Sequence, residues 1–135
     1  MIRSVTRRPL QMKPLLLIAL LFALFAVSSV HAQAESTSGK VFWRGSVDNK
    51  VHLTIKGDTL EQKTVEGADK PDGTFSFTAP LPDQAVTVGV TRKEGRSKKI
   101  KVIQQPTADN DFTAIVEIHD DGGGARDYVL EIFWQ

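Results

Sequence analysis

Residues 112–134 read FTAIVEIHDDGGGARDYVLEIFW, and this stretch decides the fold. Apolar residues occupy every second position from 112 to 118 and again from 128 to 134. A period of two, with β-branched and aromatic side chains, predicts strands that bury one face. Gly122, Gly123 and Gly124 between the two runs predict a turn, because glycine adopts positive φ at little steric cost. We therefore predict two antiparallel strands joined as a hairpin.

The same alternation continues toward the N-terminus, in residues 51–55, 75–77 and 86–90. Less regular strands are predicted for the remaining gaps: 40–47, a polar edge strand at 60–65, and 98–104. We expect residues 86–92 and 98–104 to form a second hairpin through the turn at 94–97. No helical period competes with this pattern. The result is an all-β prediction: a single antiparallel immunoglobulin-like β-sandwich of about seven to eight strands over residues 39–135.

A signal peptide is predicted for residues 1–34. Four basic residues and no acid precede an apolar run at 15–27, which is shorter than the about 20 residues of a membrane-spanning helix. Ala32-Gln33-Ala34 then matches the A-x-A cleavage pattern, so we expect cleavage after Ala34. Residues 35–38 would form a short disordered N-terminus.

Two alternatives stay open for this segment. Cleavage after Ala32 or an uncleaved N-terminal anchor would also fit the slow fading of the apolar run. Arg7-Arg8 suggests the twin-arginine export route, whereas the strongly hydrophobic core of the segment favours the general secretory route. In either case we predict a periplasmic or extracellular protein, with no membrane-spanning segment in the mature chain.

Composition excludes several classes of protein. The 135 residues are 41% hydrophobic and 24% charged, as in an ordinary globular domain, and contain no cysteine. Disulfide frameworks, thiolate metal sites and cysteine nucleophiles are therefore excluded. The chain has 17 basic and 16 acidic residues, and four of the basic ones lie in residues 1–34, so the remainder has 13 against 16, a net charge near −3. Overall basicity thus gives no argument for nucleic-acid binding.

One family resemblance rests on the motif Asp72-Gly73-Thr74-Phe75-Ser76-Phe77, followed by Leu81-Pro82 and the alternating run 85–90. This pattern resembles the carboxypeptidase-regulatory-like domains of exported bacterial proteins. The resemblance covers about twenty residues and implies a small transthyretin-like β-sandwich without catalytic activity. Those domains typically end soon after the valine strand, whereas this chain continues with further predicted strands.

Hydrolase chemistry is not predicted. The only histidines after the signal peptide, His52 and His119, occupy the polar phase of their strands, and no G-x-S-x-G motif is present. Solvated side chains are the ordinary interpretation of such positions. We therefore predict a non-enzyme without cofactors.

Acidic residues flank the strand at 112–119, and hard oxygen ligands in loops are typical of calcium sites. The candidates are Asp109, Asp111, Asp120 and Asp121, with Asp127 after the glycine turn. The intervening strand would keep the two groups about 20 Å apart, and no twelve-residue calcium loop is present. We interpret these acids as turn formers and predict no metal site. His52 and His119 could ligate a transition metal only from adjacent strands that face the same way.

A basic segment, residues 92–101, is the most distinctive charge feature. Its cations are Arg92, Lys93, Arg96, Lys98, Lys99 and Lys101, offset by Glu94. On the predicted hairpin they would form one positive patch, able to contact an anionic glycan or an acidic envelope protein. The alternative is edge protection, because lysines on a peripheral strand prevent edge-to-edge aggregation. The segment lacks aromatic residues for base stacking, so nucleic acid is not a predicted partner.

Trp43 and Trp134, with Phe133, are the aromatic residues that we expect outside the inward phase. They could pair in a capping cluster if the terminal strands are neighbours, or their exposed faces could stack on sugar rings. The sequence thus predicts an exported, non-catalytic β-sandwich with a structural or interaction role in the cell envelope. The alternative is a binding module for an anionic polymer or glycan, through the basic segment or the tryptophans. An enzyme ranks third.

Overall fold

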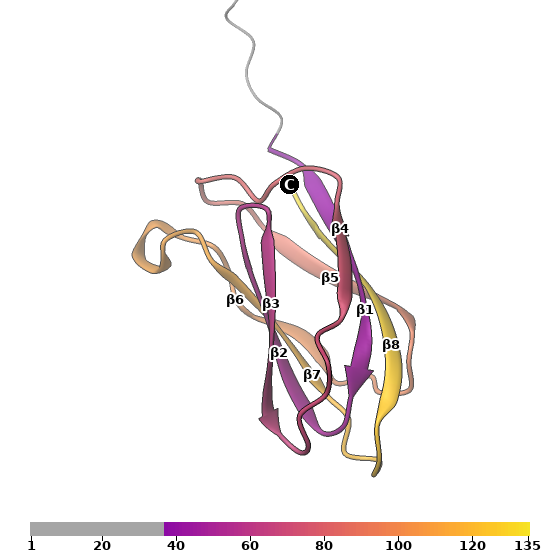
Figure 1. Ribbon diagram of the computed structural model, residues 1–135. Helices are drawn as coiled ribbons and strands as arrows, with labels where there is room; N and C mark the ends of the chain where they lie inside the picture. The colour runs from indigo at the N-terminus through magenta and orange to yellow at the C-terminus, as the bar shows by residue number, and fades with distance from the viewer. Residues whose placement is uncertain (1–36) are drawn as a thin grey trace, which may run out of the picture. The chain divides into compact units, whose positions relative to one another are not determined.

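The computed structural model of the chain describes residues 37–135, which form strands and one 3₁₀ turn, η2 (Ala108–Asn110) (Figure 1). The strands are β1 (Gly39–Val47), β2 (Lys50–Lys56), β3 (Thr59–Glu66), β4 (Thr74–Phe77), β5 (Val88–Glu94), β6 (Ile100–Gln104), β7 (Ala114–His119) and β8 (Arg126–Trp134). Within this part of the chain, no helix has the length and apolar character of a membrane span. The predicted signal peptide, its cleavage after Ala34 and residues 35–36 lie outside the described residues.

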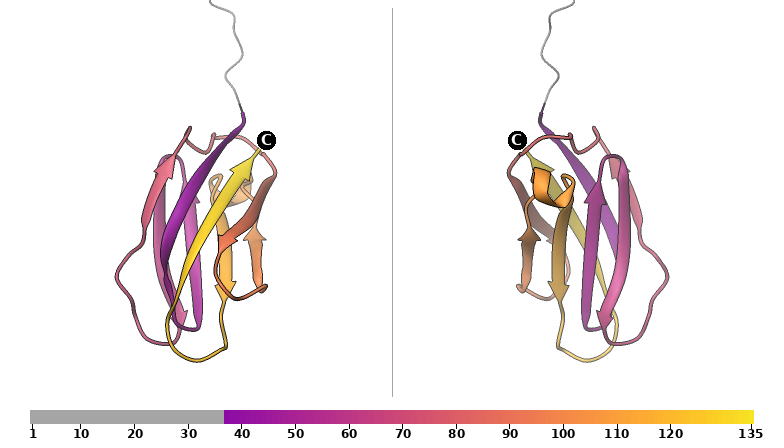
Figure 2. Two further views of the ribbon diagram at one scale, coloured as in Figure 1. Left: turned by 90° about the vertical axis from the view of Figure 1, so that its right-hand side faces the viewer. Right: turned by 90° about the vertical axis from the view of Figure 1, so that its left-hand side faces the viewer.

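The strands form two four-stranded antiparallel sheets, ordered β4-β1-β8-β5 and β3-β2-β7-β6. Figure 2 shows them as two layers of one sandwich. The first and last strands, β1 and β8, are neighbours from Gly39 opposite Trp134 to Val47 opposite Arg126. The prediction of an all-β fold built from two antiparallel sheets is confirmed.

Alternation along the strands creates the core. In β2 and β7 every second residue is buried, as the period of two predicts, and the opposite phase is only partly buried. The fully buried residues of both sheets face one another: Val41, Trp43, Val47, Val51, Leu53, Ile55, Ala114, Val116, Ile118, Tyr128, Leu130 and Ile132, all at most 1% exposed. Burying an aliphatic side chain of this size stabilises a fold by about 1.5–3 kcal/mol, so this two-faced layer holds the sheets together.

Both predicted hairpins are wrong. Strand β5 pairs with β8 and strand β6 pairs with β7, so the turn at 94–97 carries the chain from one sheet to the other. The glycine turn does the same, because β7 pairs with β2 and β6, whereas β8 pairs with β1 and β5. Two strands with one apolar face each can bury these faces across the sandwich as well as side by side. Turn composition does not distinguish the two arrangements.

Four strands lie at sheet edges. The predicted polar edge strand is confirmed as β3, and β4 is the edge of the other sheet on the same side, where Gly73 N–H donates to Gln62 Oε1 at 2.9 Å. At the opposite side, edges β5 and β6 approach each other. The two open sides of the sandwich therefore differ in sequence, and both carry candidate functional residues.

Candidate functional site

The basic segment lies on the β5–β6 side and spans both sheets. Arg92 and Lys93 belong to β5, Lys101 belongs to β6, and the other three cations lie in the connection between them. All six side chains are exposed. The cations therefore border the change of sheet rather than a single hairpin, which corrects the geometry expected for the patch.

Most of these cations have partners within the domain. Arg96 Nη2 donates to Asp120 Oδ1 at 2.7 Å, Lys99 Nζ to Asp121 Oδ2 at 2.8 Å, and Lys93 Nζ lies 3.5 Å from Glu131 Oε2. Arg92 Nη1 donates to two carbonyl oxygens of the segment itself. Lys98 and Lys101 take part in none of the ion pairs among residues 37–135. They border a hollow of about 260 Å³ with His119. The segment is thus largely neutralised, and at this hollow the charges of Lys98 and Lys101 lie beside Glu117, which is opposite Lys101 in the sheet register.

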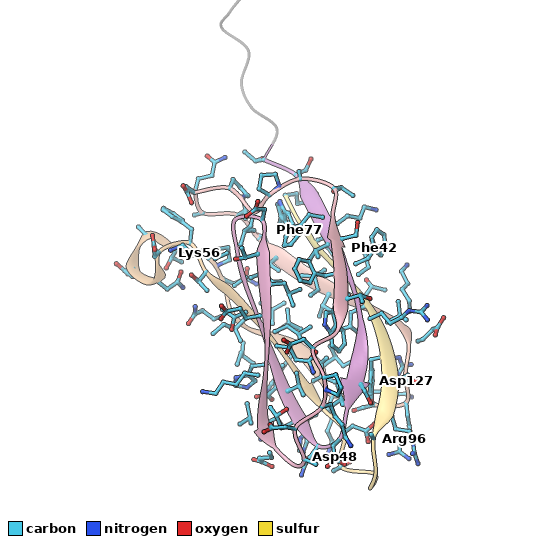
Figure 3. The ribbon with its side chains drawn as sticks, in the orientation of Figure 1. Phe42, Asp48, Lys56, Phe77, Arg96 and Asp127 are labelled. Atoms are coloured by element: carbon cyan, nitrogen blue, oxygen red, sulfur yellow. The ribbon has the colours of Figure 1, made fainter. Side chains whose placement is uncertain are left out.

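Asp120 is the centre of a buried polar network. Its carboxylate is 2% exposed and accepts hydrogen bonds from Tyr128 Oη at 2.6 Å, from Arg96 and from the backbone N–H of Gly122 at 3.0 Å. Tyr128 Oη in turn accepts the N–H of Ser97 at 2.9 Å. These residues form the Asp120 network, which joins the β5–β6 connection to the β7–β8 connection. Figure 3 places Arg96 at the same end of the sandwich as Asp48.

The pKa values of this network follow from burial and hydrogen bonding. Burial by itself raises the pKa of Asp120, but the hydrogen bonds from Arg96, Tyr128 and Gly122 outweigh it and hold the pKa below the ordinary value. Burial, together with the hydrogen bond to Asp120, raises the pKa of Tyr128. Asp120 is thus a buried carboxylate with all its hydrogen bonds made, and it links the β5–β6 connection to the β7–β8 connection.

The other metal-ligand candidates are dispersed. Asp111 forms an ion pair with Lys56, Asp121 forms one with Lys99, and Asp109 is an exposed residue of the turn η2. No group of three or more potential metal ligands occurs within residues 37–135. The acids at the two ends of β7 are separated by that strand.

The histidines do meet the geometric condition set for them, because β2 and β7 are adjacent and His52 and His119 point to the same outer face. His52 lies opposite Glu117 and donates from Nε2 to its carboxylate at 2.9 Å, whereas His119 lies opposite Lys50. The hydrogen bond from His52 lowers the pKa of Glu117. His52 is thereby a partner in a cross-strand pair.

Both tryptophans are core residues, so the alternative of an exposed sugar platform is wrong, whereas burial, the commoner case for tryptophan, holds. Trp43 is 1% exposed and Trp134 is 2% exposed. Trp134 packs against Phe77, with 6.3 Å between the ring centroids. Their strands are neighbours, as a capping cluster would need, but each indole is enclosed between the sheets.

Two exposed phenylalanines, which the sequence analysis had placed inward, mark the β4 side instead. Phe42 is 39% exposed and Phe75 is 45% exposed. Trp43 takes the inner phase of β1, so its neighbour Phe42 faces out (Figure 3). Phe75 lies opposite Trp43 in the register, but β4 is a short edge strand, and its side chain reaches the open rim. The buried face of β1 could have been predicted from the sequence, because the apolar residues Val41, Trp43 and Val47 all fall on the same face of the strand.

These phenylalanines line a groove of about 430 Å³, the aromatic groove. Its other residues are Trp43, Arg44, Thr74, Ser76 and Val129. Exposed aromatic side chains with polar neighbours at a concave surface are typical of a binding site. The aromatic groove is therefore a candidate functional site that the sequence analysis missed.

Comparison with known proteins gives no relative. No family model, no curated protein and no solved structure matches the chain.

Proposed function

We propose that this chain is an exported, non-catalytic β-sandwich of the immunoglobulin-like class that acts by binding a component of the cell envelope. The resemblance of residues 72–90 to carboxypeptidase-regulatory-like domains supports a non-catalytic module of this kind. The observation that carries the proposal is the aromatic groove, where Phe42 and Phe75 expose apolar surface beside Arg44. Apolar side chains held at a concave surface contribute to binding because a partner removes them from water.

The binding surface is tested by retention of envelope components on the immobilised domain. Phe42→Ser/Phe75→Ser should reduce retention strongly, because it removes both exposed phenylalanines that border the groove. Val65→Ser/Ile103→Ser is the matched control, since Val65 is 44% exposed and Ile103 is 41% exposed on other strands. Equal loss in both double variants would point to non-specific hydrophobic adsorption and contradict the proposal.

Export is tested by N-terminal sequencing of the protein from an envelope fraction. The order of basic residues, apolar run and Ala32-Gln33-Ala34 predicts a mature N-terminus at Glu35 or at Gln33. Recovery of Met1 would instead support the uncleaved anchor.

A second candidate function is the binding of an anionic polymer at the hollow bordered by Lys98, Lys101 and His119. Two lysines outside the ion pairs of residues 37–135 favour it, Glu117 in the same hollow opposes it, and edge protection of β6 is the competing explanation. Retention on heparin should fall in Lys98→Glu/Lys101→Glu and with rising salt if the hollow binds anions. Aggregation of that variant, without heparin binding by the wild type, would favour edge protection.

A further inference from the structure

Next to the aromatic groove, on the other side of Phe75, lies a second pocket of about 330 Å³, the Trp43 pocket. Its lining comes from β1, β3 and the start of β4: Trp43, Leu60, Glu61, Gln62, Asp72, Gly73 and Phe75. The volume falls within the range of about 300–1,000 Å³ of small-molecule sites. The pocket thus connects the two edge strands of this side.

The Trp43 pocket holds two buried hydrogen-bond donors without partners. Trp43 Nε1 and Gln62 Nε2 have no hydrogen-bond partner among residues 37–135. Leaving such a donor unpaired costs about 1–3 kcal/mol, so a ligand that supplies acceptor atoms would recover this free energy. By contrast, the carbonyl oxygen of the Gln62 amide is satisfied by Gly73 N–H, which fixes the direction of its NH₂ group.

Gly73 lies directly against the indole N–H, where a larger residue would not fit. A Cβ on this residue would lie 2.5 Å from Trp43 Nε1 and 2.5 Å from Arg44 O. Both donor nitrogens are shielded from solvent by their surroundings. A ligand atom therefore reaches them only when the segment 67–73 shifts outward. Ala68 N–H to Asp48 and Gly73 N–H to Gln62 hold the two ends of this segment through side-chain acceptors.

The rim of the pocket has the opposite hydrogen-bonding character. Glu61 and Asp72 are exposed carboxylates and accept hydrogen bonds only, while Phe75 offers an apolar wall. An anionic ligand is disfavoured by the two rim carboxylates. A simple cation is disfavoured by the N–H donors inside. A hydroxyl group satisfies both regions, because it donates to a carboxylate and accepts from an N–H.

We propose that the Trp43 pocket binds a neutral sugar residue of a glycan, with hydroxyl oxygens accepting from Trp43 Nε1 and Gln62 Nε2, hydroxyl groups donating to Glu61 and Asp72, and the ring against Phe75. This inference rests on the proposed function and names the chemistry of the partner. In this proposal Trp43 contributes to sugar binding through a hydrogen bond from its indole N–H, not through stacking of the sugar on its ring face.

The direct test follows the side-chain N–H signals of ¹⁵N-labelled protein, residues 35–135 with the signal peptide removed as in the exported form. The probes are neutral hexasaccharides (cellohexaose, maltohexaose and chitohexaose) at millimolar concentration, with a heparin-derived hexasaccharide as the anionic comparison. We expect a neutral probe to shift the Trp43 indole and the Gln62 amide signals and to leave the Trp134 indole signal unchanged. No shift with any neutral probe, or a shift with the anionic probe alone, would overturn the assignment.

Variants separate this assignment from the proposed function. Glu61→Gln should weaken binding of the shifting probe about tenfold at unchanged melting temperature. Gln62→Leu should weaken it as much, but it also removes the acceptor of Gly73 N–H, so its melting temperature is measured beside it. Glu66→Gln, on the same strand but outside the pocket, should bind as the wild type does. If Phe42→Ser/Phe75→Ser loses envelope retention but no sugar shifts the signals of the wild-type protein, the sugar assignment is refuted. The proposed function would still stand in that case. Wild-type retention by that double variant would refute the proposed function itself.

Discussion

The Asp120 network and the β4 side of the sandwich treat buried polar groups in opposite ways. Around Asp120 each carboxylate oxygen accepts a short hydrogen bond, and the Tyr128 hydroxyl both donates and accepts. On the β4 side, Trp43 Nε1 and Gln62 Nε2 have no hydrogen-bond partner among residues 37–135, in the pocket that exposed Phe75 also lines. Saturated polar groups stabilise and fix a structure, whereas unsatisfied donors beside exposed aromatic surface favour a ligand. The comparison assigns the first region to holding the fold and makes the second the region where we propose binding.

The largest effect is expected at Asp120. Asp120→Ala leaves the Tyr128 hydroxyl and the Gly122 N–H without their acceptor inside the network, and should lower the free energy of unfolding by about 3 kcal/mol. Urea denaturation measures the change. The neighbouring exposed Asp121, paired only with Lys99, is the control, and Asp121→Ala should have little effect. Equal losses in the two variants would contradict a special role for the network.

A smaller effect is expected at Gly95, whose φ of +126° lies in a region that other residues rarely adopt. A Cβ there would also run into the Tyr128 ring. Gly95→Ala should therefore destabilise the fold by about 2–3 kcal/mol, from backbone strain and a displaced ring. Gly123 shares positive φ, at +74°, but has open space around it, so Gly123→Ala should cost about 1 kcal/mol. Thermal unfolding of the pair isolates the contact with Tyr128, and equal shifts would exclude it.

The pH dependence of stability should follow the lowered pKa of Asp120. The folded-state pKa lies below the unfolded value of about 3.9, so this carboxylate stabilises the folded state fully above that value. Its contribution is lost as the pH falls through the folded-state pKa. Glu117 and Asp121, whose pKa values are also lowered, act in the same direction. In Asp120→Asn the melting temperature should fall less between about pH 6 and about pH 3 than in the wild type. Parallel curves would show that Asp120 does not titrate with folding.

The smallest effect on stability is expected in the aromatic groove. Phe42 faces solvent on the outer side of β1, and its replacement by serine should change the free energy of unfolding by no more than about 0.5 kcal/mol. Phe75 contacts Phe77 edge to face at 5.7 Å, so Phe75→Ser should cost about 1 kcal/mol. Chemical denaturation checks both values. Losses as large as that of Asp120→Ala would mean that these side chains serve the core rather than binding.

Much of the fold could be predicted because its strands carry their own signal. In β2 and β7 the alternation of Val51, Leu53 and Ile55 with polar residues requires one buried face, and the structure confirms it. The sheet assignments could not be predicted in this way. The turns before β6 and β8 are compatible with a hairpin or with a crossover. The crossovers follow from long-range pairing, because β8 lies between β1 and β5 whereas β7 lies between β2 and β6.

The candidate site was less predictable for the same reason. The irregular sequence of β1 does not show clearly which of its faces is buried. With the wrong face taken as buried, Phe42 was predicted inside and Trp43 outside, whereas the structure has the reverse. The cations of the basic segment were visible in the sequence, but their neutralisation by Asp120, Asp121 and Glu131 depends on residues brought close by both crossovers. Charge density along the chain therefore overstated charge on the surface.

One measurement tests most directly whether binding belongs to the β4 side: retention of envelope components by Phe42→Ser/Phe75→Ser and by Lys98→Glu/Lys101→Glu, side by side at temperatures well below both melting points. The account predicts that the first variant loses retention and that the second keeps it. Retention kept by the first variant and lost by the second would contradict it, and would place binding at the basic segment instead.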